Sequence, residues 1–150
     1  MTLKEYLDEC IKLYYSKVID KYSFQLVETL SEGPGMLYTY QNDSFRIRVV
    51  NDRGLINAEV ASLYDPDHYF DIYLFLAHIR LTAHPEEAIN DWDKRMILSR
   101  QLSCEEETTV IDDHYAIIST LLSGDHYAAT TQAMKALARE HDFLLYGRPK

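Results

Sequence analysis

The chain of 150 residues is long enough for one compact domain spanning residues 1–150, and its hydrophobic content of 47% with 12% aromatics excludes a disordered chain. The formal net charge of −9 argues against unassisted binding to nucleic acid or to an anionic membrane, because a basic patch supplies most of that affinity. An acidic chain suits a basic protein partner.

The N-terminal residues, MTLKEYLDEC, are charged and lack the apolar core of a signal peptide. Cys10 and Cys104 form no C-x-x-C pair, so we expect free thiols in a reducing cytoplasm. The longest apolar run, residues 69–79, is interrupted by Asp71 and His78. It is far shorter than the roughly 18 residues of a membrane span, so we expect no membrane insertion.

The first third of the chain predicts a helix followed by a strand. Thr2 and Glu5 have the spacing of a capping box, and periodic apolar residues extend the helix to about Asp20. Residues 23–31 predict a strand that ends at Gly33-Pro34-Gly35.

Residues 36–62 predict three antiparallel strands joined by tight turns. Apolar residues alternate with polar ones in this segment, at Phe45, Ile47, Val49, Ile56, Ala58 and Val60. Turns centred on Asn42-Asp43 and Asp52-Arg53 produce one apolar and one polar face. The predicted pairs are Tyr40–Phe45, Tyr38–Ile47, Phe45–Val60, Ile47–Ala58, Val49–Ile56, Arg46–Glu59 and Arg48–Asn57.

The second half of the chain predicts about four helices. Residues 68–81 are apolar nearly all round, which is typical of a buried central helix, and a further helix spans Pro85 to about Leu102. Ser103 and Glu106 form a capping box for a helix that Gly124 ends. Its predicted stripe is Val110, His114, Ile117 and Leu121, widened by Ile111, Ile118 and Leu122. Asp125 caps the last helix, with Tyr127, Thr131, Met134, Leu137 and Ala138 inward.

The predicted fold class is therefore α+β. We expect a four-stranded antiparallel meander sheet, with an N-terminal helix and about four C-terminal helices packed mainly on one face.

No sequence motif predicts a catalytic residue or a cofactor. The chain contains no G-x-S-x-G, P-loop, G-x-G-x-x-G or zinc-knuckle pattern. Asp-His-Tyr occurs three times, at residues 67–69, 113–115 and 125–127, and two of its aspartates are explained as helix caps. No His-x-x-x-His or Glu-x-x-His spacing places two ligands on one helical face, so we expect no bound metal. Cys104 begins a helix, but three following glutamates oppose the dipole that would activate its thiol, so we expect a structural cysteine.

An acidic strip is the candidate partner-binding site. Its residues are Glu105, Glu106, Glu107, Asp112 and Asp113, with Tyr115 as a neighbouring aromatic anchor. The alternative is that the three glutamates only complement the helix N-terminus. The polar sheet face, with Thr39, Arg46, Arg48, Asn57 and Glu59, is either solvated, covered by a helix or a recognition surface.

Residues 45–73 carry a resemblance to known domains. The segment runs FRIRVVNDRGLINAEVAS, a short loop containing proline, and HYFDIYLFL. It resembles small uncharacterised bacterial α+β domains with a strand, an Asp-Arg-Gly turn, a strand and an aromatic-Asp-Ile/Leu helix. Some of these look like immunity proteins of polymorphic toxin systems. The resemblance covers about a fifth of the chain, implies a bacterial protein that binds a toxin, and carries over no functional residue.

The leading hypothesis is a non-enzymatic cytoplasmic protein-binding domain, an immunity protein for a basic toxin. The second is a small enzyme or ligand-binding domain, which requires a pocket that holds two or more of His68, His78, His114, His126 and Asp113. The third is a structural homodimer that pairs through the polar sheet face or an edge strand.

Overall fold

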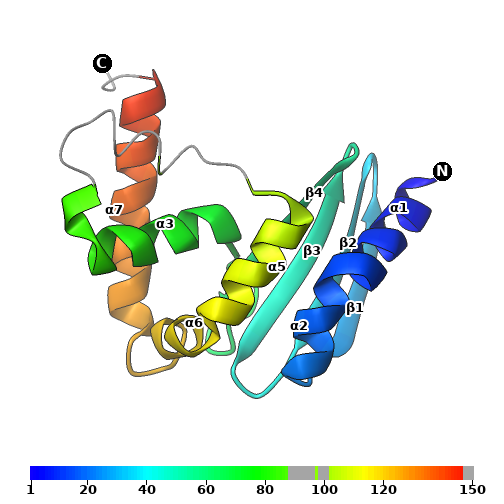
Figure 1. The fold of residues 1–150 in the computed structure, drawn as a ribbon, viewed down its shortest axis with the longest axis horizontal. Coiled ribbons are helices and arrows are strands. Elements are labelled where there is room, and N and C mark those ends of the chain that lie inside the picture. The colour runs from blue at the N-terminus through cyan, green and yellow to red at the C-terminus, as the bar shows by residue number, and fades with distance from the viewer. Residues whose placement is uncertain (88–96, 98–101, 147–150) are drawn as a thin grey trace.

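The computed structural model describes residues 1–87, 97 and 102–146, and shows an α+β fold built on a five-stranded antiparallel sheet in the order β1-β2-β3-β4-β5 (Figure 1). The strands are β1 (Gln25–Glu32), β2 (Gly35–Gln41), β3 (Phe45–Asp52), β4 (Leu55–Ser62) and β5 (Phe70–Asp71). The sequential order confirms the predicted meander and adds a fifth strand to it.

The helices fall into an N-terminal and a C-terminal group. The N-terminal helix is continuous through α1 (Leu3–Cys10), a π-helical turn (Ile11–Tyr15) and α2 (Ser16–Lys21). The C-terminal group consists of α3 (Ile72–Ala83), a short 3₁₀ turn (Pro85–Glu87), α5 (Cys104–Asp113), α6 (Tyr115–Leu121) and α7 (Tyr127–Tyr146). Most of the helix predicted from Pro85 to Leu102 lies outside the described residues.

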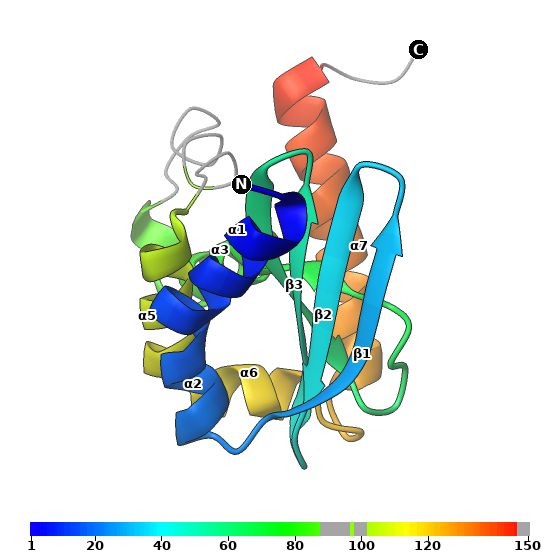
Figure 2. The same ribbon diagram turned by 90° about the vertical axis from the view of Figure 1, so that its right-hand side faces the viewer.

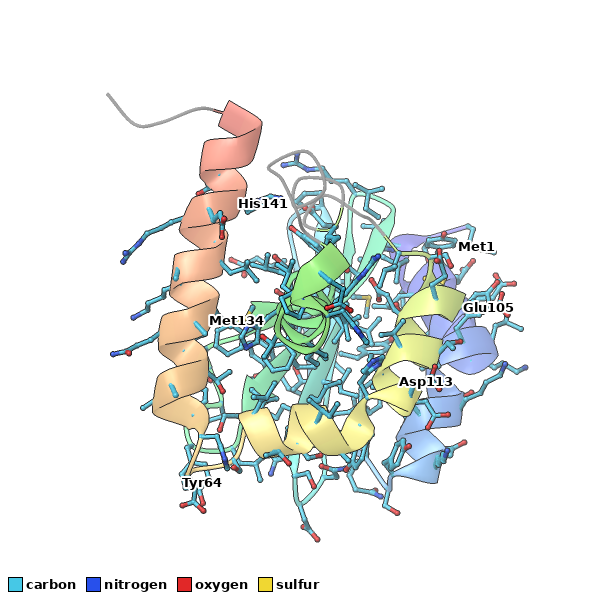
Figure 3. The ribbon with its side chains drawn as sticks, turned by 60° about the vertical axis from the view of Figure 1, so that its left-hand side comes forward. Met1, Tyr64, Glu105, Asp113, Met134 and His141 are labelled. Atoms are coloured by element: carbon cyan, nitrogen blue, oxygen red, sulfur yellow. The ribbon has the colours of Figure 1, made fainter. Side chains whose placement is uncertain are left out.

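The helices α1, α3 and α5 contact the sheet, and α7 packs against α3. Figure 2 shows α1, α2 and α5 on one side of the strands, with β1 at the edge. Met134 lies on the side of α7 that faces α3 and is buried there (Figure 3). The predicted apolar face is confirmed as the core face, with Phe45, Ile47, Val49, Ala58 and Val60 all buried and Ile56 half-buried against them.

The predicted strand pairs were wrong by two residues. Ile47 pairs with Val60 and Arg48 with Glu59, because the turn is centred on Arg53 and Gly54. Both turn residues have positive φ, +56° and +93°, as a type I′ hairpin requires, and glycine takes the second position. A shift of two residues changes every partner and leaves each side chain on its predicted face.

The first turn is displaced in the same direction. Tyr40 pairs with Ile47, and Tyr38 with Val49. The Asn42 side-chain oxygen accepts hydrogen bonds from the backbone N–H groups of Ser44 at 2.8 Å and Phe45 at 3.1 Å. Asn42 therefore closes the turn from its first position instead of occupying its centre.

The central helix begins later than predicted. Residues Phe70 and Asp71 form β5, which pairs with Val60 and Glu59, so α3 starts at Ile72. Within α3, Ile72, Phe75, Leu76, Ala77 and Ile79 are buried, which confirms a largely internal helix. The edge of β4 is open at this point, so the chain first pairs with it as a short strand and then forms α3.

The helix predicted between Ser103 and Gly124 is two helices. It breaks at His114, whose backbone ends α5, and α6 runs in a different direction (Figure 1). The predicted stripe is confirmed in part: Ile111, Ile118 and Leu122 are fully buried, whereas Ile117 is 45% exposed. Because of this bend, Ile111 on α5 and Ile118 on α6 both reach the same core.

Candidate protein-binding surface

The acidic strip separates into exposed, paired and buried residues. Glu105 and Asp113 are exposed near the two ends of α5 (Figure 3). Glu106 is exposed as well and completes the predicted capping box, since Ser103 N–H donates to its carboxylate and its own N–H donates to Ser103 Oγ, both at 3.2 Å. These three carboxylates are the part of the predicted strip that faces solvent.

Glu107 lies inside the core and is only 1% exposed. Its Oε2 accepts hydrogen bonds from Tyr15 Oη at 2.6 Å and from the Ala58 backbone N–H at 3.0 Å. Burial raises the pKa of this carboxyl to about 8. Glu107 therefore joins α5 to the N-terminal helix and to β4, and contributes nothing to a surface.

The hydrogen bond from the Ala58 N–H to Glu107 is possible because β5 is short. β5 pairs only with Glu59 and Val60, so the next outward N–H of β4 has no strand partner. The Glu107 carboxyl supplies the acceptor. A signal was present in the sequence: Glu107 precedes Ile111 by four residues, which places both on one helical face.

Asp112 and Tyr115 are engaged within the fold. Lys21 Nζ lies 2.8 Å from Asp112 Oδ1, and Tyr22 Oη donates to the same oxygen. These hydrogen bonds lower the pKa of Asp112. Tyr115 stacks on Tyr22 with ring centroids 3.7 Å apart, and its hydroxyl accepts from Asn42 Nδ2 at 2.7 Å. Asp112 therefore connects the end of α5 with the end of α2. Tyr115 connects the start of α6 with the β2–β3 turn.

An apolar pocket of about 360 Å³ lies between α3 and α5. The polar residues of its described lining are Tyr73, Arg80, His84 and His114. The ring of His114 lies 2.9 Å from the Val110 carbonyl, at its own helix end. The ligand-binding hypothesis requires a pocket that holds at least two of the five His and Asp residues named for it. Of those five, only His114 lines this pocket, so the requirement is not met.

The remaining members of that set are scattered. His68 lies beside Phe70, His126 is next to Ser123, and Asp113 is exposed. His78 is half-buried on α3, and burial lowers its pKa. Within the described ranges no three His, Cys, Asp or Glu side chains gather as metal ligands.

The two cysteines come close together, which their separation in the sequence did not indicate. Cys10 and Cys104 are free thiols that line the same surface depression, between the N-terminal helix and α5. Burial raises the pKa of Cys104 to about 11. A thiol with that pKa is scarcely ionised near neutral pH, which favours the structural role expected for it.

The outer face of the sheet carries the predicted polar residues in new pairs. Arg48 Nε donates to Glu59 Oε1 at 2.9 Å, and its guanidinium lies 3.8 Å from the centre of the Tyr69 ring. Arg46 Nε donates to Gln41 Oε1 at 2.7 Å. Thr39 is completely buried among these side chains, and its hydroxyl has no hydrogen-bond partner among the residues that the structure describes.

A shallow depression of about 400 Å³ opens on this face beside β1. Apolar Leu30, Leu37 and Val50 line it, together with the carboxylates of Glu32 and Asp52. This part of the outer face is accessible to a partner.

Strand β1 borders the depression, and all eight of its residues are exposed. Leu26, Val27 and Leu30 are 54%, 48% and 45% exposed, and no other strand of the described chain pairs with its outer edge (Figure 2). Its charged residues, Glu28 and Glu32, are both acidic. The sequence predicted a strand here but did not indicate that it would form an open edge.

No helix within the described residues has the length and apolar character required to cross a bilayer. Comparisons with protein-family models, with curated proteins and with solved structures find no match to this chain.

Proposed function

We propose that this protein is a non-enzymatic cytoplasmic binding protein for a basic protein partner, in the manner of an immunity protein that neutralises a bacterial toxin. The observation that carries the proposal is the exposed strand β1, with its apolar side chains, beside an accessible depression on the sheet. Exposed apolar surface with a polar rim is typical of a protein–protein interaction site.

The charge of the molecule supports a basic partner. The net charge is −9, and exposed carboxylates flank the depression at Glu32 and Asp52 and occupy α5 at Glu105, Glu106 and Asp113. Complementary charge raises association rates and disfavours acidic competitors.

The test is binding to the product of the neighbouring reading frame in the source genome. We expect a complex that sediments as a single species, and relief of growth inhibition when both genes are expressed together. A neighbouring product that is toxic, folded and not bound by this protein would contradict the proposal.

A second candidate is a ligand-binding domain, and the apolar pocket between α3 and α5 is the observation that favours it. A ligand there should raise the unfolding temperature. The increase should be lost in Ile117→Arg, because Ile117 lines the pocket and is 45% exposed, so the substitution leaves the core unchanged. The unfolding temperature is measured with a panel of small, mostly apolar molecules that carry one negative charge. Circular dichroism checks that the variant is folded.

A further inference from the structure

The outer edge of β1 has a definable set of unpaired backbone groups. In an antiparallel sheet, alternate residues direct their N–H and C=O groups to opposite neighbours. The Asn42 N–H donates to the Phe45 carbonyl at 3.3 Å, so this residue directs its groups to β3. Counting back from Asn42 by twos, Tyr38 also directs its backbone N–H and C=O to β3. The intervening residues Leu37 and Thr39 direct theirs to β1.

The partners of Leu37 and Thr39 on β1 are Leu30 and Glu28, which therefore bond to β2. The intervening Thr29 and the following Ser31 direct their N–H and C=O groups away from the sheet. These groups form a regular ladder beyond the single irregularity between Leu26 and Glu28.

This edge lacks most of the features that protect natural sheet edges. Short length, lysine, internal proline and bulges usually prevent a free strand from pairing with another chain. β1 has eight residues, no lysine and no internal proline, and its one bulge precedes the regular part. The edge can therefore accept a further strand.

The side chains of β1 select the charge of that strand. Glu28, Leu30 and Glu32 follow one another at alternate positions, so all three lie on the outer face. A second copy of this chain would bring its own two carboxylates to this edge, and both molecules carry a net charge of −9. A partner strand with basic residues opposite Glu28 and Glu32 and an apolar residue opposite Leu30 is complementary.

We infer that β1 binds an extended segment of a basic protein by strand addition, and that this segment has the pattern base-x-apolar-x-base. The inference rests on the proposed function and specifies the mode and chemistry of its partner. Main-chain hydrogen bonds to Thr29 and Ser31 hold the segment, and alternate side chains give the specificity.

The probe is a library of random eight-residue peptides displayed on phage and selected on the immobilised protein, a length that matches β1. We expect enriched peptides to carry Lys or Arg two residues before and two residues after an apolar residue. Failure to enrich any peptide, or enrichment of a different pattern, would overturn the inference.

The strongest selected peptide is then synthesised, and its dissociation constant is measured with three variants. Thr29→Pro with Ser31→Pro removes the two outward N–H groups, and proline is tolerated where an edge N–H faces solvent. We expect at least about tenfold weaker binding. The control, Thr29→Val with Ser31→Val, changes the same side chains and keeps both N–H groups, so binding should be retained. Glu28→Gln with Glu32→Gln should weaken binding at low salt and less at high salt.

Hydrogen exchange on the unmodified protein provides a readout that does not depend on folding of the proline variant. The amides of Thr29 and Ser31 should exchange more slowly when the peptide is bound. Protection on α5 instead, or a dimer of the free protein that the prolines dissociate, would overturn the inference. A toxin that binds the unmodified and the double-proline protein equally would remove strand addition and leave the proposed function intact.

Discussion

At the scale of the residue, Glu107 is the side chain whose setting departs most from its place in the sequence. It lies within the run Glu105–Glu106–Glu107, where all three appear equivalent. In the structure its neighbours reach solvent, and it accepts hydrogen bonds from Tyr15 and Ala58 in the core. The same residue type therefore serves as a cap, a surface charge and an interior acceptor.

The buried carboxyl of Glu107 predicts a pH dependence of stability. Its pKa in the folded protein is about 8, well above the 4.5 of a free glutamate. Between these values the folded state binds more protons than the unfolded state, so the free energy of unfolding should fall as pH rises across this window. The loss should amount to a few kcal/mol. Urea unfolding from pH 5 to pH 9 measures it.

Glu107→Gln is the matched control for that experiment. Its amide oxygen can accept the same two hydrogen bonds, and it has no titrating proton. The stability of the variant should be less dependent on pH than that of the unmodified protein. Parallel pH profiles for the two proteins would exclude Glu107 as the source.

Adjacent residues on β3 predict opposite sensitivities. Ile47 is 1% exposed on the core face, so Ile47→Ala should lower the free energy of unfolding by about 2–5 kcal/mol. Arg46 is half-buried on the outer face and pairs with Gln41, so Arg46→Ala should cost under about 1 kcal/mol. Chemical denaturation compares them, and a larger cost for Arg46→Ala would mean that the outer face is covered.

At the scale of the element, turn geometry decided the pairing of the strands. The Asp-Arg-Gly sequence marks the hairpin, but two adjacent centres are compatible with it. Arg53 has a φ of +56°, in the left-handed region. This region is unfavourable for any residue with a Cβ atom, because Cβ then lies close to the following carbonyl oxygen. The turn tolerates this because Gly54 takes the more extreme angle, +93°.

Arg53→Asn should stabilise the hairpin, because Asn-Gly is the preferred pair of a type I′ turn. The gain should be up to about 1 kcal/mol in the free energy of unfolding. Gly54→Ala is the counterpart, and it should destabilise the protein because alanine disfavours positive φ. Denaturant midpoints measure both changes. A destabilised Arg53→Asn would show that the Arg53 side chain has a role beyond the turn.

At the scale of the whole molecule, charge is the property that connects the fold with the proposed basic partner. The exposed carboxylates of α5 and of β1 belong to separate elements of a chain with net charge −9. Steering acts through the summed field, so the residues on α5 can speed association without touching the partner.

Charge reversal on α5 tests that contribution. Glu105→Lys with Asp113→Lys should slow association with a basic partner at low salt and reduce the salt dependence of the rate. Glu106 is left unchanged because its side chain completes the helix cap. Asp43→Lys with Asp67→Lys reverses two exposed carboxylates on loops, changes the net charge by the same amount, and is the control. An unchanged rate and salt dependence in the double variant would remove α5 from the interaction.

Local patterns determined most of the elements and the two faces of the sheet. The alternation of residues 45–60 established which side of the sheet is apolar, since side-chain direction repeats every second residue and does not depend on the partner strand. The same pattern could not settle the pairing, because a shift of two residues satisfies it equally well. The Thr2 and Ser103 caps were likewise evident, because a cap is formed within four residues.

Tertiary structure alone decided several features that the sequence did not indicate. The burial of Glu107 requires a donor from β4, and the bend at His114 accompanies the stacking of Tyr115 on Tyr22. Cys10 and Cys104 line one depression because α5 packs against the N-terminal helix. The exposure of β1 has the same origin, because a strand becomes an edge only when no other segment pairs with it. Each is a contact, or a missing contact, between residues far apart in the chain. Local periodicity carries no information about such contacts.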